Sequence, residues 1–123
     1  ELFPNSQNYA HIYEEVGLLG PKTILAHCIH LTPDKTEIIK KHDCAIAHCP
    51  NSNFALNSGV LNIRNVLAND IKVGLGSDVS GGYSVSILDA MRQAIIASKT
   101  RYFEDPSNVP LKVNEAFYLA TLG

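Results

Sequence analysis

Three short apolar segments alternate with longer amphipathic ones along this chain. The apolar segments lie at 22–31, 44–50 and 71–78. Within each of them, apolar residues follow one another instead of occupying every second position, which is typical of strands buried on both faces. Such strands occur in parallel sheets that are covered by helices. The alternation therefore predicts an α/β fold with three parallel strands.

Helical patterns separate these strands. Thr32, Pro33 and Asp34 form the clearest helix start, as N-cap, first helical position and first-turn acid. The polar segment 51–59 and the proline-containing segment 101–111 are expected to be loops. The expected helices cover residues 5–20, 32–43, 60–70, 84–100 and 112–122.

The length of the chain limits how far this fold extends. Its 123 residues form one segment, 1–123, with no low-complexity break. A closed (β/α)8 barrel needs about 250 residues, so the three strand–helix units are expected to form part of such a barrel, roughly its second half. The ends "ELFPN" and "ATLG" read as cut, and we expect the chain to be a piece of a longer protein.

Charge and cysteine content argue against several classes of protein. A net charge of -2 gives no basic field, which argues against nucleic acid as a partner. No apolar run reaches the ~20 residues of a membrane-spanning helix, so no membrane partner is expected. The three cysteines, Cys28, Cys44 and Cys49, form no C-x-x-C pair. Their odd number favours a reducing, cytoplasmic location over a disulfide framework.

Each predicted strand carries a titratable residue near its carboxyl end: His27, His48 and Asp78. Active sites of parallel α/β proteins are built at these ends. One such histidine is usually a hydrogen-bonded core residue, and one such aspartate is usually a cap or turn residue. Three on successive units favour a site, and their donor atoms suit a catalytic zinc or iron ion. The residues alone thus indicate a half-site of a metal-dependent hydrolase.

Two glycines precede the aspartate on the third strand. By alternation, Gly74, Gly76 and Asp78 share one face, and the glycines are expected to leave open space beneath the carboxylate. A twisted or kinked strand would explain the same glycines. A dinucleotide loop is excluded, because the pattern G-x-G-x-x-G would need glycine where Val79 stands.

Three stretches resemble guanine deaminases of the amidohydrolase superfamily. They are "TILAHCIHL", "AIAHCPNSNFALNSGVLNI" and "KVGLGSDVSGGYSVSILDAMRQAI", and they follow in the family's order over nearly the whole chain. "HCPNSN" and "GLGSD" are shared by several amidohydrolases, whereas "SDVSGGYSVSILDA" is more specific. The resemblance implies a (β/α)8 barrel with one zinc ion, of which this chain would hold strands six to eight.

The resemblance also implies roles for single residues. Asp78 matches the zinc ligand of strand eight, which also carries protons, and His27 matches the strand-six histidine that contacts the attacking water or the substrate. Both would therefore be catalytic and substrate-binding. His48 receives no catalytic role, and its loop is expected to shape the pocket wall. The family's H-x-H of strand one and H-x-x-E of strand five are expected to lie outside this chain, so the segment alone is expected to be inactive.

The activity implied is the zinc-dependent hydrolysis of guanine to xanthine and ammonia, by a full-length enzyme expected to be a homodimer. Gly81 and Gly82 are expected to let the chain turn tightly after Asp78. Two alternatives stay open: a related amidohydrolase that acts on another purine or a triazine ring, and a non-catalytic fragment that needs the rest of the barrel.

Overall fold

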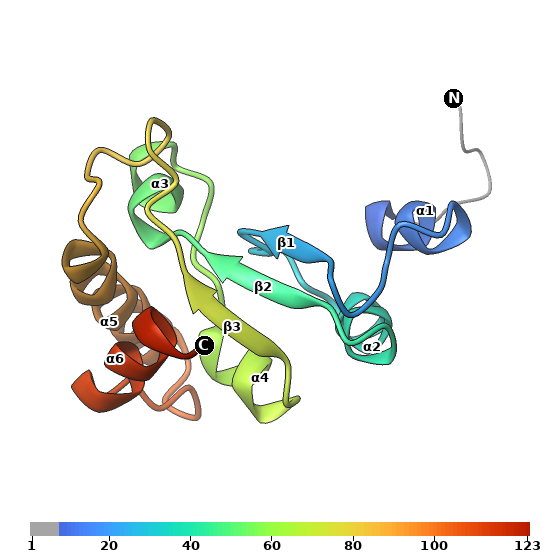
Figure 1. Ribbon diagram of the computed structural model, residues 1–123. Coiled ribbons are helices and arrows are strands. Elements are labelled where there is room, and N and C mark those ends of the chain that lie inside the picture. Colours follow the sequence, from blue (N-terminus) through green and yellow to red (C-terminus); the bar gives the residue numbers. More distant parts are fainter. Residues whose placement is uncertain (1–7) are drawn as a thin grey trace.

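The computed structural model describes residues 8–123 and contains one parallel sheet. Its strands are β1 (Ile24–Ala26), β2 (Ala45–His48) and β3 (Lys72–Leu75), in the order β1-β2-β3 (Figure 1). Leu25 pairs with Ile46, and Ile46 pairs with Val73, so the strands run in register. The predicted α/β fold with parallel strands is confirmed. The assignment of these strands to positions six to eight of a barrel stays a prediction.

The first two helices lie beside each other at the β1 end of the sheet (Figure 1). They are α1 (Tyr9–Glu15) and α2 (Pro33–Lys41). Glu14 joins them, because its carboxylate lies 2.8 Å from both Lys41 Nζ and His42 Nε2. The hydrogen bonds from Lys41 and then His42 lower the pKa of Glu14 to about 2. Part of the predicted helix 5–20, residues 5–7, lies outside the described residues.

The start of α2 agrees with its sequence signals. Thr32 is the N-cap, and Pro33 opens the helix. The Thr32 hydroxyl donates to the Asp34 carboxylate, whereas no backbone N–H of the helix donates to the Thr32 side chain. The cap position was therefore predictable, but its hydrogen bond was not.

A third helix, α3 (Pro50–Ala55), replaces most of the loop that was expected at 51–59. Pro50 ends the strand, as predicted, but it also occupies the first turn of a helix, where its missing N–H needs no partner. The first four residues of α3 are buried although three of them are polar. The polar composition of this segment was thus misleading, because these side chains face the interior.

The remaining helices are α4 (Ile63–Ala68), α5 (Ile87–Glu104) and α6 (Val113–Thr121). The expected loop at 101–111 is wrong at its beginning, since α5 continues to Glu104. The helix ends where Asp105 takes an extended conformation in front of Pro106. None of the described helices is long and apolar enough to cross a membrane.

The core lies between the sheet and the helices that cover it. Ile46 and Val73 supply the central strand residues, each at most 2 % exposed. Apolar side chains from the helices and their connections complete the cluster, among them Ile39, Leu61, Ile63, Val66, Ile71, Ala94, Leu111 and Leu119. The strands that lead to the site are thus packed against a hydrophobic core.

Arg64 on α4 ties α6 and the segment before it to the core. Its guanidinium donates to both carboxylate oxygens of Glu115, at 2.8 and 3.2 Å, and to the carbonyls of Val109 and Pro110, at 2.9 and 3.3 Å. These hydrogen bonds lower the pKa of Glu115. All five guanidinium donors sit in a fixed fork, so a single side chain fixes three neighbouring groups.

We expect Arg64→Met to destabilise the full-length protein by roughly 1.5–3 kcal/mol, the range for hydrogen bonds to charged groups. Lys40→Met is the matched control, because within residues 8–123 the Lys40 ammonium makes one exposed ion pair, at 3.9 Å from Asp70, which should contribute ~0–1 kcal/mol. Urea unfolding measures both variants. Equal losses for the two would contradict the role given to Arg64.

Candidate active site

The structure brings His27 and Asp78 together at the carboxyl ends of the two outer strands. His27 Nε2 lies 3.6 Å from Asp78 Oδ2, and the two side chains are 37 % and 38 % exposed. β2 lies between β1 and β3, so the two side chains meet across the end of the central strand. A nitrogen and a carboxylate oxygen that face each other beyond direct hydrogen-bond distance leave both atoms available to a third group.

Left-handed backbone conformations aim these two side chains. The φ angle is 65° at His27, 50° at Cys28 and 46° at Asp78. The sheet pairing reaches His27, whose N–H donates to the carbonyl of Ala47 at 2.9 Å, and the chain turns directly afterwards. Positive φ is uncommon outside glycine and concentrates at functional sites. Both predicted site residues therefore sit where the strand geometry ends abruptly.

The loop after β3 contains the two glycines that were expected to form a tight turn. The turn exists, since Gly82 N–H donates to the carbonyl of Asp78 at 2.6 Å. Positive φ, however, does not explain these glycines, because among the described glycines only Gly17 and Gly59 have it. A Cβ at Gly82 would lie 2.3 Å from the carbonyl oxygen of Ser77. Close packing of the loop on itself, and not an unusual backbone conformation, requires glycine here.

The open space expected beneath Asp78 is not there. A Cβ on Gly74 would meet the backbone oxygen of Gly123 at 3.3 Å, and one on Gly76 would meet Cys49 Sγ at 3.0 Å. The strand alternation that placed the glycines under Asp78 stops with β3 at Leu75. The glycines allow other parts of the chain to approach β3, so the expectation of a ligand space at this point was wrong.

Asn53 on α3 is a site residue that the sequence reasoning missed. Its Oδ1 lies 2.9 Å from His27 Nδ1. On the same helix, Asn51 Nδ2 donates to Asp89 Oδ2 of α5 at 3.0 Å. The signal was available in "HCPNSN", where proline opens a helix whose first turn is polar, but only burial of that turn reveals its role.

His48 lies in the core, and its ring makes no hydrogen bond with any described residue. The residue is 1 % exposed, and both ring nitrogens are buried without a partner. Burial lowers the pKa of His48 to about 4, and the neighbouring His27 adds to the effect. The imidazole is therefore neutral at physiological pH. Its place beneath the site agrees with a structural role.

A metal ion would find only part of its ligands in the described chain. Nowhere in residues 8–123 do three His, Cys, Asp or Glu side chains cluster closely enough to hold one. The nearby Cys49 thiol is held protonated, because burial and then the Asp78 carboxylate raise its pKa. The half-exposed carboxylate of Asp78 is the donor that fits zinc, with His27 beside it.

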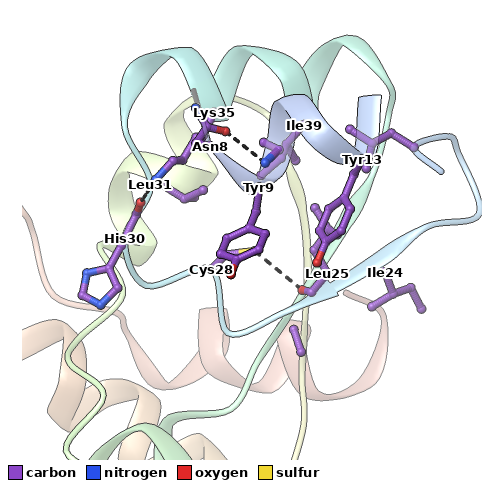
Figure 2. A pocket seen from close by; sticks show the side chains of 13 residues that line it. Asn8, Tyr9, Tyr13, Ile24, Leu25, Cys28, His30, Leu31, Lys35 and Ile39 are labelled. Carbon is purple, nitrogen blue, oxygen red and sulfur yellow. Dashed lines mark hydrogen bonds between the residues drawn. The ribbon is translucent and has the colours of Figure 1, made fainter. Parts of the chain in front are cut away.

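A separate apolar cavity of about 460 Å³ lies between α1, α2 and β1. Figure 2 shows the rings of Tyr9 and Tyr13 extending from α1 over Leu25 and Cys28. Neither His27 nor Asp78 lines it, and no carboxylate does. The polar strand ends, and not this cavity, thus carry the groups capable of hydrolytic chemistry.

Comparison with known proteins agrees with this geometry. The model of the amidohydrolase family matches residues 2–123. The chain belongs to this family. It is 48 % identical over 122 residues to a guanine deaminase of Dictyostelium discoideum. The alignment covers 99 % of this chain and 27 % of that protein. The chain thus spans about a quarter of the length of such relatives.

Solved structures of other proteins superpose on this chain. A guanine deaminase from C. acetobutylicum with guanine in its active site superposes with a TM-score of 0.93, at 38 % identity, over 98 % of this chain and 29 % of that one. A variant atrazine chlorohydrolase from Arthrobacter aurescens, complexed with zinc and atraton, superposes with a TM-score of 0.73 at 25 % identity, over 88 % of this chain and 24 % of that one.

The burial of neutral His48 predicts a pH-dependent stability. Its folded pKa of about 4 lies below the ordinary 6.5, so the unfolded chain takes up the proton first as the pH falls. Stability is complete above about pH 6.5 and decreases toward pH 4. We expect this residue to account for a loss on the order of 1–2 kcal/mol by about pH 5.

Urea unfolding of the full-length protein across this pH range tests the prediction. His48→Leu should remove this part of the acid sensitivity, whereas the matched control His30→Gln, at an exposed position, should retain it. An unchanged pH dependence in His48→Leu would show that the ring is not held neutral by burial.

Proposed function

We propose that this chain is part of a zinc-dependent guanine deaminase, which hydrolyses guanine to xanthine and ammonia. The observation that carries the proposal is the approach of His27 Nε2 to Asp78 Oδ2, at 3.6 Å, at the ends of parallel strands. The similarity to guanine deaminases over nearly the whole chain supports guanine as the substrate. β1, β2 and β3 would then be strands six, seven and eight of a (β/α)8 barrel.

In the proposed reaction a zinc ion lowers the pKa of water to about 7, which supplies hydroxide near neutral pH. Asp78 would be one of its ligands, and the other ligands would lie outside this chain. The Asp78 carboxylate accepts a proton from the attacking water and later helps to pass one to the departing ammonia. His27 Nε2 orients the water by a hydrogen bond. Both residues thus contact the reacting atoms or the substrate.

The proton for the ring nitrogen would come from a glutamate outside this segment. The H-x-x-E that the described residues contain, His11 to Glu14, lies on helix α1, where Glu14 is bound by Lys41 and His42. The segment 1–123 would be one continuous part of the catalytic domain and inactive on its own. We further propose that the full-length enzyme is a cytoplasmic homodimer. Its substrate is the purine, and it binds neither nucleic acid nor a membrane.

A triazine or another purine ring is the second candidate substrate. The observation in its favour is the superposition of an atrazine chlorohydrolase on the same three-stranded segment. Comparing kcat/KM for guanine, adenine and a triazine in the full-length protein separates the candidates. Turnover of none of them would favour the third alternative, a non-catalytic fragment that needs the rest of the barrel.

Replacing Asp78 should separate metal binding from proton transfer. In the full-length enzyme, Asp78→Ala should abolish guanine-dependent ammonia release and lower the zinc content. Asp78→Asn should keep part of the zinc and still lose ~10²–10⁴-fold in turnover, because an amide cannot take up the proton. Asp70→Asn is the control, because Asp70 is an exposed surface residue that shares the left-handed backbone of Asp78. Wild-type zinc content and turnover in Asp78→Ala would refute the assignment.

His27→Ala should lower turnover by about a hundredfold, the effect of removing one transition-state hydrogen bond, while zinc stays bound. Steady-state kinetics and zinc analysis of the same preparation provide the measurement. Loss of zinc together with activity would make His27 a ligand, and the proposed strand numbering would then be wrong.

A further inference from the structure

The contacts of His27 determine which of its nitrogens carries the proton. A neutral imidazole has one N–H donor and one acceptor nitrogen. Nδ1 lies 2.9 Å from Asn53 Oδ1, which is a hydrogen-bond distance, and an amide oxygen can only accept. With this orientation of the Asn53 amide, Nδ1 is the protonated nitrogen, and Nε2 presents its lone pair toward Asp78. The 3.6 Å separation from Asp78 Oδ2 is too long for a direct hydrogen bond.

The opposite arrangement conflicts with the proposed chemistry. With the amide of Asn53 reversed, its NH2 group would donate to Nδ1, and Nε2 would carry the proton. That N–H would point at the carboxylate oxygen of Asp78 and compete for it with the zinc ion. With Oδ1 facing Nδ1, the lone pair of Nε2 is instead free to accept a hydrogen bond from a water between the two side chains.

Burial restricts the Asn53 side chain, whose Nδ2 has no partner among the described residues. Asn53 is 3 % exposed and lies in the first turn of α3, where its neighbours are also buried. Asn51 anchors that turn to α5 through its 3.0 Å bond to Asp89, and the Ser86 side chain accepts from the backbone N–H of Asp89. An acceptor that is ordered before substrate arrives needs no further loss of conformational freedom.

We propose that Asn53 is a positioning residue that holds His27 in the Nδ1–H tautomer, with the Nε2 lone pair aimed at the attacking water. The choice of amide orientation and the catalytic part of this inference rest on the proposed deaminase function, whereas the 2.9 Å contact and the measurement of the tautomer do not. Hydrogen-bond partners that set the tautomer and ring orientation of a metal-site histidine typically change activity by ~10–100-fold when removed.

The test uses the full-length, zinc-loaded protein with 15N-labelled histidine, at a pH where imidazole is neutral. The ring-nitrogen shifts of His27, assigned by comparison with His27→Gln, should show an Nδ1–H ring in the wild type. Asn53→Leu has nearly the same volume but no acceptor, and should convert His27 to the Nε2–H form. Asn53→Asp keeps an acceptor oxygen at the same place and should retain Nδ1–H.

Kinetics of the same samples complete the test. In Asn53→Leu we expect kcat to fall ~10–100-fold with unchanged zinc content, and in Asn53→Asp most of the turnover to remain. Asn65→Leu, at an exposed position on α4, is the matched control and should leave both the tautomer and kcat unchanged. If Asn53→Leu does not fold, Asn53→Ser replaces it, because serine is too short to reach His27 and adds no apolar bulk.

An Nε2–H ring in the wild type would overturn the inference, as would an Nδ1–H ring with wild-type kcat in Asn53→Leu. A purely structural role for Asn53 would change stability in both variants without moving the tautomer. The proposed function fails separately, if the wild-type protein does not release ammonia from guanine. The tautomer shift between wild type and Asn53→Leu then still decides whether Asn53 positions His27.

Discussion

Parallel pairing of the three strands is the constraint on which the rest of the structure depends. Because the strands run in the same direction and in register, their carboxyl ends meet at one edge of the sheet. His27 and Asp78 lie far apart in sequence, and this shared edge is what brings their side chains within 3.6 Å. The apolar core below the edge supplies the stability, so the edge itself is free to carry polar and strained residues.

The central strand and the helix that follows it contribute residues next to the site. His48 is the last residue of the central strand and forms a buried, neutral ring. Directly after it the chain enters α3, whose buried polar turn reaches His27 through Asn53 and α5 through Asn51. Burial of so many polar groups is unfavourable unless they find partners. In this turn Asn53 and Asn51 each have one such partner, whereas Asn51 Oδ1, Ser52 Oγ and Asn53 Nδ2 have none among the described residues.

The sequence predicted the parts of this architecture that depend on local patterns. Apolar strand runs, the start signal around Pro33 and the strand-end position of Asp78 are all readable from neighbouring residues. The contact of Asn53 with His27 was not readable, because it joins residues 26 positions apart through a helix whose composition resembles a loop. The close contacts at Gly74 and Gly82 were not predictable either, because a sequence does not show which distant atoms approach a glycine.

The left-handed backbone at His27 and Asp78 limits how these positions can evolve. Few residues tolerate that conformation, chiefly glycine, asparagine, aspartate and histidine. The backbone alone would therefore select from this short set, even in a descendant that had lost its chemistry. A histidine or aspartate at these two positions in another family member is thus weak evidence of activity on its own. A stronger criterion is an intact partner for the histidine on the buried helix beside it.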